Sequence, residues 1–148
     1  MKLALEQAEK AMAIGEVPVG CIIVDKNNKV ISSSFNLKES NHDPCGHAEI
    51  IAIREAAKAL GNWRLKDCRM YVTLEPCTMC MGALVHSRIS DLVFGAYDLK
   101  AGAISLGQNL HQNPRLNHRF SVVGGLMHYE ASRMLSTFFK QRRAFYRK

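Results

Sequence analysis

The chain has 148 residues, the size of one ordinary domain and enough to bury a substantial core. Hydrophobic residues make up 47% and charged residues 22%, and no stretch approaches the roughly 18 consecutive apolar residues that indicate a membrane span. The net charge of +7 favours a polyanionic partner, although many basic domains carry only a solvated cationic face.

Residues 1–14 predict an amphipathic helix and not a secretory signal. Leu5 and Ala8 fall on one helical face, and Glu6 and Glu9 interrupt the apolar run that an export signal requires. The chain also has five cysteines, an odd number, which without export indicates reduced thiols or metal ligands. We therefore expect a cytoplasmic protein.

Further along the chain, runs rich in β-branched residues alternate with helical patterns. The turn residues 25–28 separate two such runs and predict a β-hairpin, and Gly61 ends the helix that follows. Pro76 suits the first turn of a later short helix. The expected elements are, in order, a helix (1–14), two strands (19–24 and 29–34), a helix (47–60), a strand (70–74), a helix (77–85), two strands (91–96 and 120–123) and a helix (128–143).

Strands that alternate with helices imply a sheet covered on both faces. We therefore expect an α/β fold, a three-layer α/β/α sandwich with a partly parallel central sheet, formed by residues 1–148 as one domain. These patterns do not give the strand order. Residues 97–119 are too long for a plain connection, so either a functional or interface role or disorder is expected there.

Two short motifs, PCGHAEI at 44–50 and EPCTMC at 75–80, carry the residues of a metal site. Cys77 and Cys80 are three residues apart at a helix start, where they project from one face and the positive helix end stabilises thiolates. The spacing suits zinc, although a redox dithiol or two buried cysteines would share it. His47 supplies a third ligand and favours zinc. No residue obviously supplies a fourth, which leaves a coordination position for water.

The other three cysteines are expected to be structural. Cys21 and Cys68 border apolar strand segments, where cysteine behaves as a small hydrophobe. Cys45 lies only two residues from His47, so a closed four-ligand site that includes Cys45 stays open as an alternative.

Glu49 is the residue that indicates whether this metal site is catalytic or structural. A carboxylate two residues after a metal-binding histidine is not needed to hold the ion, and in the first helical turn its side chain can fold toward a metal-bound water. Taken alone, Glu49 would be a first-turn glutamate favoured by the helix dipole. Together with the three ligands it fits hydrolytic deamination, in which one carboxylate moves protons from water to a ring nitrogen and to a departing amine.

The sequence H-A-E at 47–49 with P-C-T-M-C at 76–80 resembles the zinc deaminase signature H-x-E with P-C-x-x-C. Over nearly the whole chain, further segments resemble the bacterial tRNA-specific adenosine deaminases. These segments are EVPVG (16–20), TLEPC (73–77), HSRI (86–89), VFGA (93–96) and LNHR (116–119). The resemblance implies a zinc-dependent domain of the cytidine and deoxycytidylate deaminase superfamily, which converts adenosine to inosine at the wobble position of a tRNA anticodon.

The same resemblance implies a five-stranded mixed sheet, a homodimer and the roles of individual residues. The implied zinc ligands are His47, Cys77 and Cys80, with Glu49 as proton shuttle. The implied contacts to the flipped base are Asn36, otherwise an ordinary loop asparagine, and the backbone amide of Ala48. The implied contacts to the tRNA anticodon stem-loop are Asp98, Lys100, Phe139, Arg142 and Arg143.

The segment FFKQRR at 138–143 mixes aromatic and basic residues, which suits RNA contact. Arg142 and Arg143 would attract phosphates, and an aromatic ring would stack on a splayed base. On an amphipathic terminal helix, however, phenylalanines often pack inward and basic residues often form a solvated face, so Phe138 is also a candidate core residue.

Two other functions stay open on the residues alone. Deaminases of free guanine, cytosine or nucleotides share the zinc signature, and Glu49 and the ligands do not separate them from an RNA deaminase. A zinc-stabilised RNA-binding module without catalysis would account for the charge and the cysteine spacing but not for Glu49. The basic terminal helix and the resemblance favour RNA as substrate.

Overall fold

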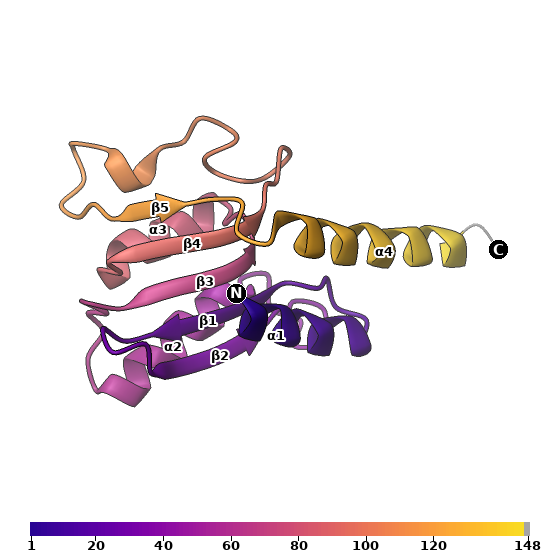
Figure 1. Ribbon diagram of the computed structural model, residues 1–148, viewed down its shortest axis with the longest axis horizontal. Coiled ribbons are helices and arrows are strands. Elements are labelled where there is room, and N and C mark those ends of the chain that lie inside the picture. Colours follow the sequence, from indigo (N-terminus) through magenta and orange to yellow (C-terminus); the bar gives the residue numbers. More distant parts are fainter. Residues whose placement is uncertain (147–148) are drawn as a thin grey trace.

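A mixed five-stranded sheet lies between two pairs of helices in the computed structural model of the chain, which describes residues 1–146 (Figure 1). The strands are β1 (Gly20–Val24), β2 (Val30–Phe35), β3 (Arg69–Leu74), β4 (Asp91–Ala96) and β5 (Ser121–Val123). The helices are α1 (Lys2–Ala13), α2 (Ala48–Leu60), α3 (Thr78–Ser87) and α4 (His128–Tyr146). The predicted order of elements is confirmed. The last two residues of the predicted domain, 147 and 148, lie outside the described residues.

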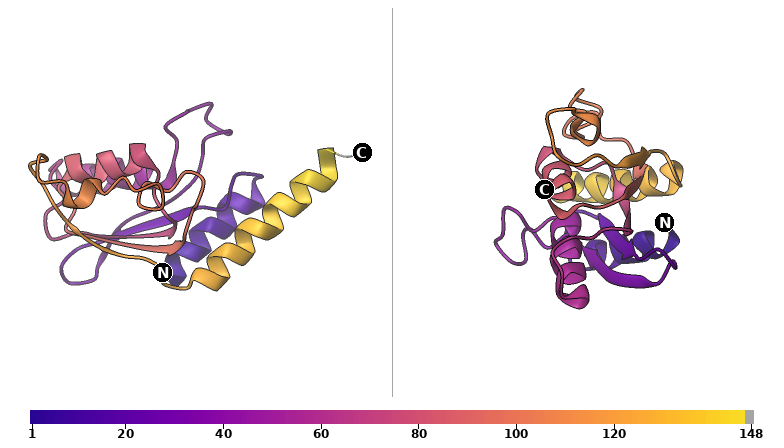
Figure 2. Two further views of the ribbon diagram at one scale, coloured as in Figure 1. Left: turned by 90° about the horizontal axis from the view of Figure 1, so that it is seen from above. Right: turned by 90° about the vertical axis from the view of Figure 1, so that its left-hand side faces the viewer.

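The helices form the two outer layers that the alternating pattern predicts. Helices α1 and α4 lie side by side on one face of the sheet, and α2 and α3 lie on the other (Figure 2). Leu5 of α1 packs with Ala131 of α4 and Ala96 of β4 in one apolar cluster. The larger core lies between the sheet and the second pair, where Ile23, Met70, Leu84 and Phe94 are among the buried side chains. The three-layer α/β/α sandwich is therefore confirmed.

The strand order is β2-β1-β3-β4-β5. Strand β1 is antiparallel to both β2 and β3, whereas β3, β4 and β5 are parallel. All five residues of β1 are buried because helices cover both of its faces, so this strand reads as a continuous apolar run. Parallel β3 and β4 end at one edge of the sheet, and the EPCTMC segment continues from β3 there. Open α/β sheets bind ligands at this edge.

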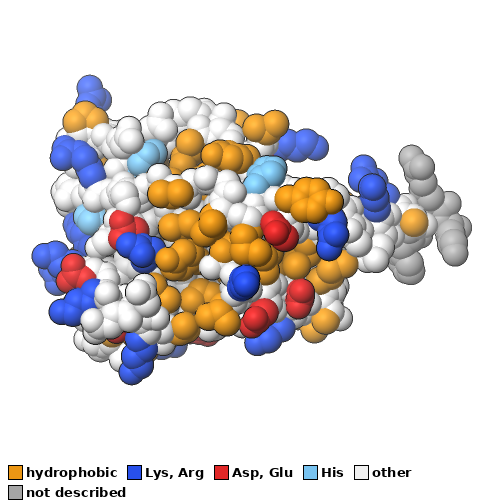
Figure 3. Space-filling view, in the orientation of Figure 1, with side chains coloured by type: hydrophobic (Ala, Val, Ile, Leu, Met, Phe, Trp, Pro, Cys, Tyr) orange, Lys and Arg blue, Asp and Glu red, His pale blue; other side chains and the backbone are white. Residues whose placement is uncertain are grey.

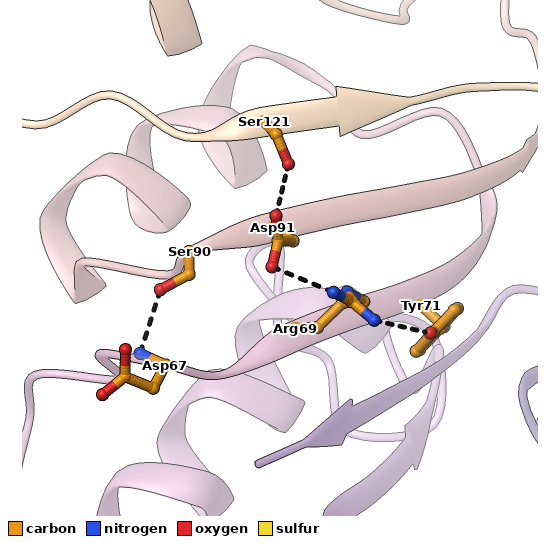
Figure 4. Close-up of polar contacts among 6 residues, drawn as sticks. All are labelled: Asp67, Arg69, Tyr71, Ser90, Asp91 and Ser121. Atoms are coloured by element: carbon orange, nitrogen blue, oxygen red, sulfur yellow. Dashed lines mark hydrogen bonds and ion pairs between the residues drawn. The ribbon is translucent and has the colours of Figure 1, made fainter. Parts of the chain in front are cut away.

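Polar contacts tie the parallel strands together at the opposite edge (Figure 4). Arg69 lies 3.4 Å from Asp91 in an ion pair, and Asp91 also accepts a hydrogen bond from Ser121. The ion pair is half-exposed and therefore contributes little to stability.

Most element boundaries differ from the sequence prediction by one to three residues. Helix α3 begins at Thr78 with Cys77 as its N-cap, so Pro76 precedes the helix and the expectation that it occupies the first turn was wrong. The cause is the extended backbone of Cys77, whose ψ is 173°. Helix α4 continues three residues beyond the predicted end at Arg143. The long connection after β4 is folded and includes a short 3₁₀ helix, Leu110–Gln112.

Hydrophobic side chains gather over the middle of the face seen in Figure 3, and Lys and Arg side chains lie around its edge and along α4. The positive charge is therefore spread over this face and not gathered in one patch. None of the helices within residues 1–146 has both the length and the apolar character needed to cross a bilayer.

Gly20 allows α1 to pack directly on β1. A Cβ atom at this position would lie 2.0 Å from the carbonyl oxygen of Ala4 and 2.5 Å from the nitrogen of Ala8. We expect Gly20→Ala to lower the free energy of unfolding by about 2 kcal/mol, because the helix must move off the sheet. Gly82→Ala is the matched control, since nothing lies within 4 Å of its Cβ position. Urea denaturation measures both variants, and equal stabilities would contradict this packing.

Candidate active site

His47 and Cys77 occupy equivalent places, each at the N-cap of a helix. His47 precedes α2 with φ −73° and ψ 146°, and Cys77 precedes α3 with φ −72° and ψ 173°. Neither side chain hydrogen-bonds its own helix, so both are available to a shared ligand. The positive ends of two helices therefore converge on one point, where they favour negatively charged sulfur.

Cys80, in the first turn of α3, completes a cluster with these two residues. The Nδ1 atom of His47 lies 3.7 Å from the Sγ atom of Cys77 and 3.5 Å from that of Cys80. All three ligand atoms lie within 4.8 Å of one another. Usual Zn–S and Zn–N bond lengths at a tetrahedral ion separate sulfur from nitrogen by about 3.6 Å. The donor set and its spacing thus fit Zn²⁺.

Within the described residues, the cluster consists of His47, Cys77 and Cys80. Cys45 is not part of it. Cys21 and Cys68 are buried, as expected for structural cysteines. All five cysteines lie outside disulfide bonds. The geometry therefore supports a three-ligand site and gives no support to the closed site with Cys45.

The two sulfurs of the cluster share a hydrogen bond. This bond lowers the pKa of the Cys77 thiol to about 4 and raises the pKa of the Cys80 thiol. A hydrogen bond with Cys77 also raises the pKa of His47. Zinc binds cysteine as thiolate, so metal binding releases any proton that these sulfurs carry.

Glu49 is buried in the first turn of α2, with 4% of its surface exposed. Burial is the largest cause that raises the pKa of its carboxyl group, and both His47 and Cys80 lie close enough to change that pKa. A glutamate that served only the helix dipole would face solvent. The structure instead places this carboxyl group beside the three side chains of the candidate zinc site.

Asn36 lies at the same end of α2. In the preceding strand, Ser32 and Ser34 donate hydrogen bonds to the carbonyl oxygens of Ala52 and Ala48, at 3.0 and 2.7 Å. Alternate residues of a strand face the same side, so Asn36, two residues after Ser34, is on the side that faces α2, and it is buried. Ala48 is the first residue of α2, so its N–H group has no partner within the helix. Both predicted base contacts therefore lie at the helix end that carries His47.

The five residues expected to contact RNA line one groove of about 930 Å³ between α4 and the chain that follows β4. They are Asp98, Lys100, Phe139, Arg142 and Arg143. Phe138 is buried and Phe139 is 45% exposed, so only Phe138 is a core residue. Leu74 also lines the groove and lies three residues before Cys77 in the chain.

Sequence reasoning missed the role of Glu75, which is buried and lies in the chain between Leu74 of the groove and Cys77 of the cluster. Its carboxylate accepts hydrogen bonds from the backbone nitrogens of Asp98 and Ser105, at 3.0 and 2.7 Å, and from the Ser105 hydroxyl at 2.6 Å. Glu75 thus fastens the loop after β4 to the segment that carries Cys77. A charged residue directly after a buried strand was the available signal.

A buried carboxyl group beside a zinc-type cluster at two helix N-termini is the arrangement of a zinc-dependent deaminase. Residues 1–96 match the family model described as the cytidine and deoxycytidylate deaminase zinc-binding region. A relative from Haemophilus influenzae named tRNA-specific adenosine deaminase is 50% identical, over 97% of this chain and 83% of the relative. One of the same name from Bacillus subtilis is 47% identical, over 97% and 88%. The chain belongs to the tRNA-specific adenosine deaminase family.

Solved structures agree with this assignment. A protein studied for A-to-I editing by tRNA:A34 deaminases at the wobble position of transfer RNA has a TM-score of 0.86 at 41% identity, covering 91% of this chain and 97% of that protein. The guanine deaminase of Bacillus subtilis has a TM-score of 0.63 at 30% identity, covering 96% and 90%. The predicted family and fold are confirmed.

We expect purified protein to contain about one zinc ion per chain under reducing conditions. Cys77→Ala removes one of three ligands and should reduce the content below about a tenth of an ion per chain. Cys45→Ser is the matched control and should keep the ion, because Cys45 lies outside the cluster. Plasma mass spectrometry measures both, and loss of zinc from the Cys45 variant would contradict the three-ligand site.

Proposed function

We propose that this chain is a single zinc-dependent domain, residues 1–148, that deaminates adenosine to inosine at the wobble position of a tRNA anticodon. One observation carries the proposal: the buried carboxyl group of Glu49 lies beside a His47, Cys77 and Cys80 cluster that fits zinc. The chain is 50% identical to a relative named tRNA-specific adenosine deaminase, which supports this substrate.

The residues of the cluster have distinct parts in this reaction. His47, Cys77 and Cys80 would hold Zn²⁺, and the bound ion would supply a nucleophile by acidifying water near neutral pH. Glu49 would take one proton from the attacking water and deliver it to the ring nitrogen next to C6 of adenine. It would then take the remaining hydroxyl proton from the oxygen on C6 and give it to the departing amine. Because Glu49 is buried, bulk water does not compete for the proton it carries. The product amine leaves as ammonia.

Asn36 and the Ala48 amide contact the flipped adenosine, and the groove beside α4 receives the neighbouring anticodon-loop nucleotides. Phe139 offers an exposed ring on which a base can stack. Arg142, Arg143 and Lys100 bring positive charge to phosphates along the same groove. The net charge of +7 suits this polyanionic partner. Asp98 also contacts the RNA in this groove, and its backbone is held in place by a hydrogen bond to Glu75.

We also propose that the protein acts as a homodimer in the cytoplasm. The family resemblance supports the homodimer, and a tRNA substrate supports the cytoplasmic location. A free purine base is the competing substrate, because the similar guanine deaminase structure shares the fold. Incubation of the protein with an adenosine-wobble tRNA and, separately, with free bases distinguishes the two. Turnover of free bases alone would reject the proposed substrate.

We expect Glu49→Gln to lower the deamination rate by at least about 100-fold, because the amide cannot accept and return protons. Zinc content and tRNA affinity should stay near those of the wild type. The readout is sequencing of treated tRNA, in which inosine reads as guanosine. Wild-type rates in the Glu49→Gln variant would remove Glu49 from the mechanism.

Arg142 and Arg143 differ in their surroundings, which allows a sharper test of the RNA groove. Arg142 donates a hydrogen bond to the Gly15 carbonyl oxygen at 3.0 Å. Within residues 1–146, Arg143 donates instead to the Phe139 carbonyl oxygen of its own helix, at 3.2 Å. We expect Arg143→Ala to weaken tRNA binding and to reduce its salt slope by about 1, with no change in Tm. Arg142→Ala should do the same and also lower the Tm.

Arg54→Ala is the matched control for this test, because Arg54 is an exposed arginine of α2 that does not line the groove. Binding isotherms at several salt concentrations measure the slope. If Arg143→Ala and Arg54→Ala give the same isotherms, the groove is not the RNA site.

A further inference from the structure

Glu16 is a buried acid outside the metal cluster. It follows α1 and is 1% exposed. Its Oε2 atom accepts a hydrogen bond from the side-chain nitrogen Nδ2 of Asn36 at 2.9 Å, and its Oε1 atom accepts one from the backbone nitrogen of Ser40 at 2.6 Å. A carboxylate is costly to bury unless hydrogen bonds compensate, and here each oxygen has a donor.

This contact selects one orientation of the Asn36 side chain. A carboxamide has nearly the same shape after a half-turn, but the turn exchanges its donor nitrogen for its acceptor oxygen. A carboxylate can only accept hydrogen bonds, so Glu16 must bond to the donor nitrogen of Asn36 and not to its oxygen. The Oδ1 atom of Asn36 is consequently turned away from Glu16.

The position of Asn36 makes this orientation relevant to the substrate. Asn36 continues the strand face whose Ser34 hydroxyl donates to the Ala48 carbonyl oxygen at 2.7 Å. The next residue, Leu37, donates through its backbone nitrogen to the Gly46 carbonyl oxygen at 3.0 Å, directly before His47. The carboxamide is therefore held from one side by Glu16 and lies at the end of α2 that carries the metal cluster.

We propose that Glu16 is a positioning residue that fixes Asn36 with its acceptor oxygen toward the substrate. This proposal rests on the proposed function, in which Asn36 contacts the flipped nucleoside. An acceptor at this place selects a hydroxyl or N–H donor of the nucleoside and disfavours a group that can only accept. Glu16 determines specificity through Asn36 and does not touch the reacting atoms.

Glu16→Gln tests the orientation directly. The backbone N–H group of Ser40 still needs an acceptor, so the oxygen of the introduced glutamine stays there and its amide nitrogen faces Asn36. The Asn36 carboxamide must then turn over and present a donor to the substrate. We expect kcat/KM for tRNA to fall by about 10- to 100-fold, mainly through KM, with zinc content unchanged.

Adding Asn36→Asp to Glu16→Gln should restore the acceptor. The amide nitrogen of the introduced glutamine donates to one oxygen of the introduced aspartate, and the other oxygen faces the substrate. The total charge of the pair is unchanged. We expect the double variant to exceed the Glu16→Gln variant in kcat/KM by about tenfold. Asn36→Asp alone sets two carboxylates against each other and should stay impaired. If Glu16 only stabilised the fold, the double variant would be no better than either single variant, which would overturn the proposal.

Amide proton exchange separates this proposal from the proposed function, because it needs no turnover. In the zinc-loaded wild type, the Asn36 Nδ2 proton that bonds to Glu16 should exchange slowly. In Glu16→Gln, the introduced glutamine should gain the protected proton and Asn36 should lose it. If wild-type protein does not act on tRNA, the proposed function fails and this measurement alone decides the role of Glu16. Unchanged protection of Asn36 in the variant would overturn that role.

Discussion

The structure depends on the convergence of two helix N-termini on one metal-sized space. His47 and Cys77 both have extended backbone at an N-cap, which turns their side chains off the helices and toward each other. Cys80 follows one turn into α3, and the imidazole nitrogen lies 3.5 to 3.7 Å from the two sulfurs. The sheet makes this convergence possible. The carboxyl ends of parallel β3 and β4 lie at the same side of the sheet, and β3 leads directly into the EPCTMC segment there.

Three buried glutamates connect the cluster of His47, Cys77 and Cys80 to the rest of the candidate site. Glu49 lies beside the ligands, Glu16 holds Asn36, and Glu75 holds the loop that begins at Asp98. Buried carboxylates are costly, and in Glu16 and Glu75 hydrogen bonds from distant segments offset the cost. Each contact therefore fixes a part of the site to the same rigid sheet edge, so that metal, base and RNA contacts keep one geometry.

The sequence predicted features that depend on neighbouring residues. The order of elements, the bounds of β4, the end of α2 at Gly61 and the cysteine and histidine motifs all follow from local patterns. Strand order does not, because it is set by pairing between distant segments. The hydrogen bonds of Glu16 and Glu75 join residues 20 to 30 positions apart, which no periodicity reports. Packing alone decides that Phe138 is buried and Phe139 exposed.

Zinc K-edge X-ray absorption of the reduced protein tests the central claim most directly, because it counts sulfur and light-atom neighbours of the ion. The three-ligand site predicts two sulfurs at about 2.3 Å and two nitrogen or oxygen atoms at about 2.0 Å, one of them from His47 and the other from water. A third sulfur would show that Cys45 or another thiol closes the site. That result, or a protein that binds no zinc, would contradict the account.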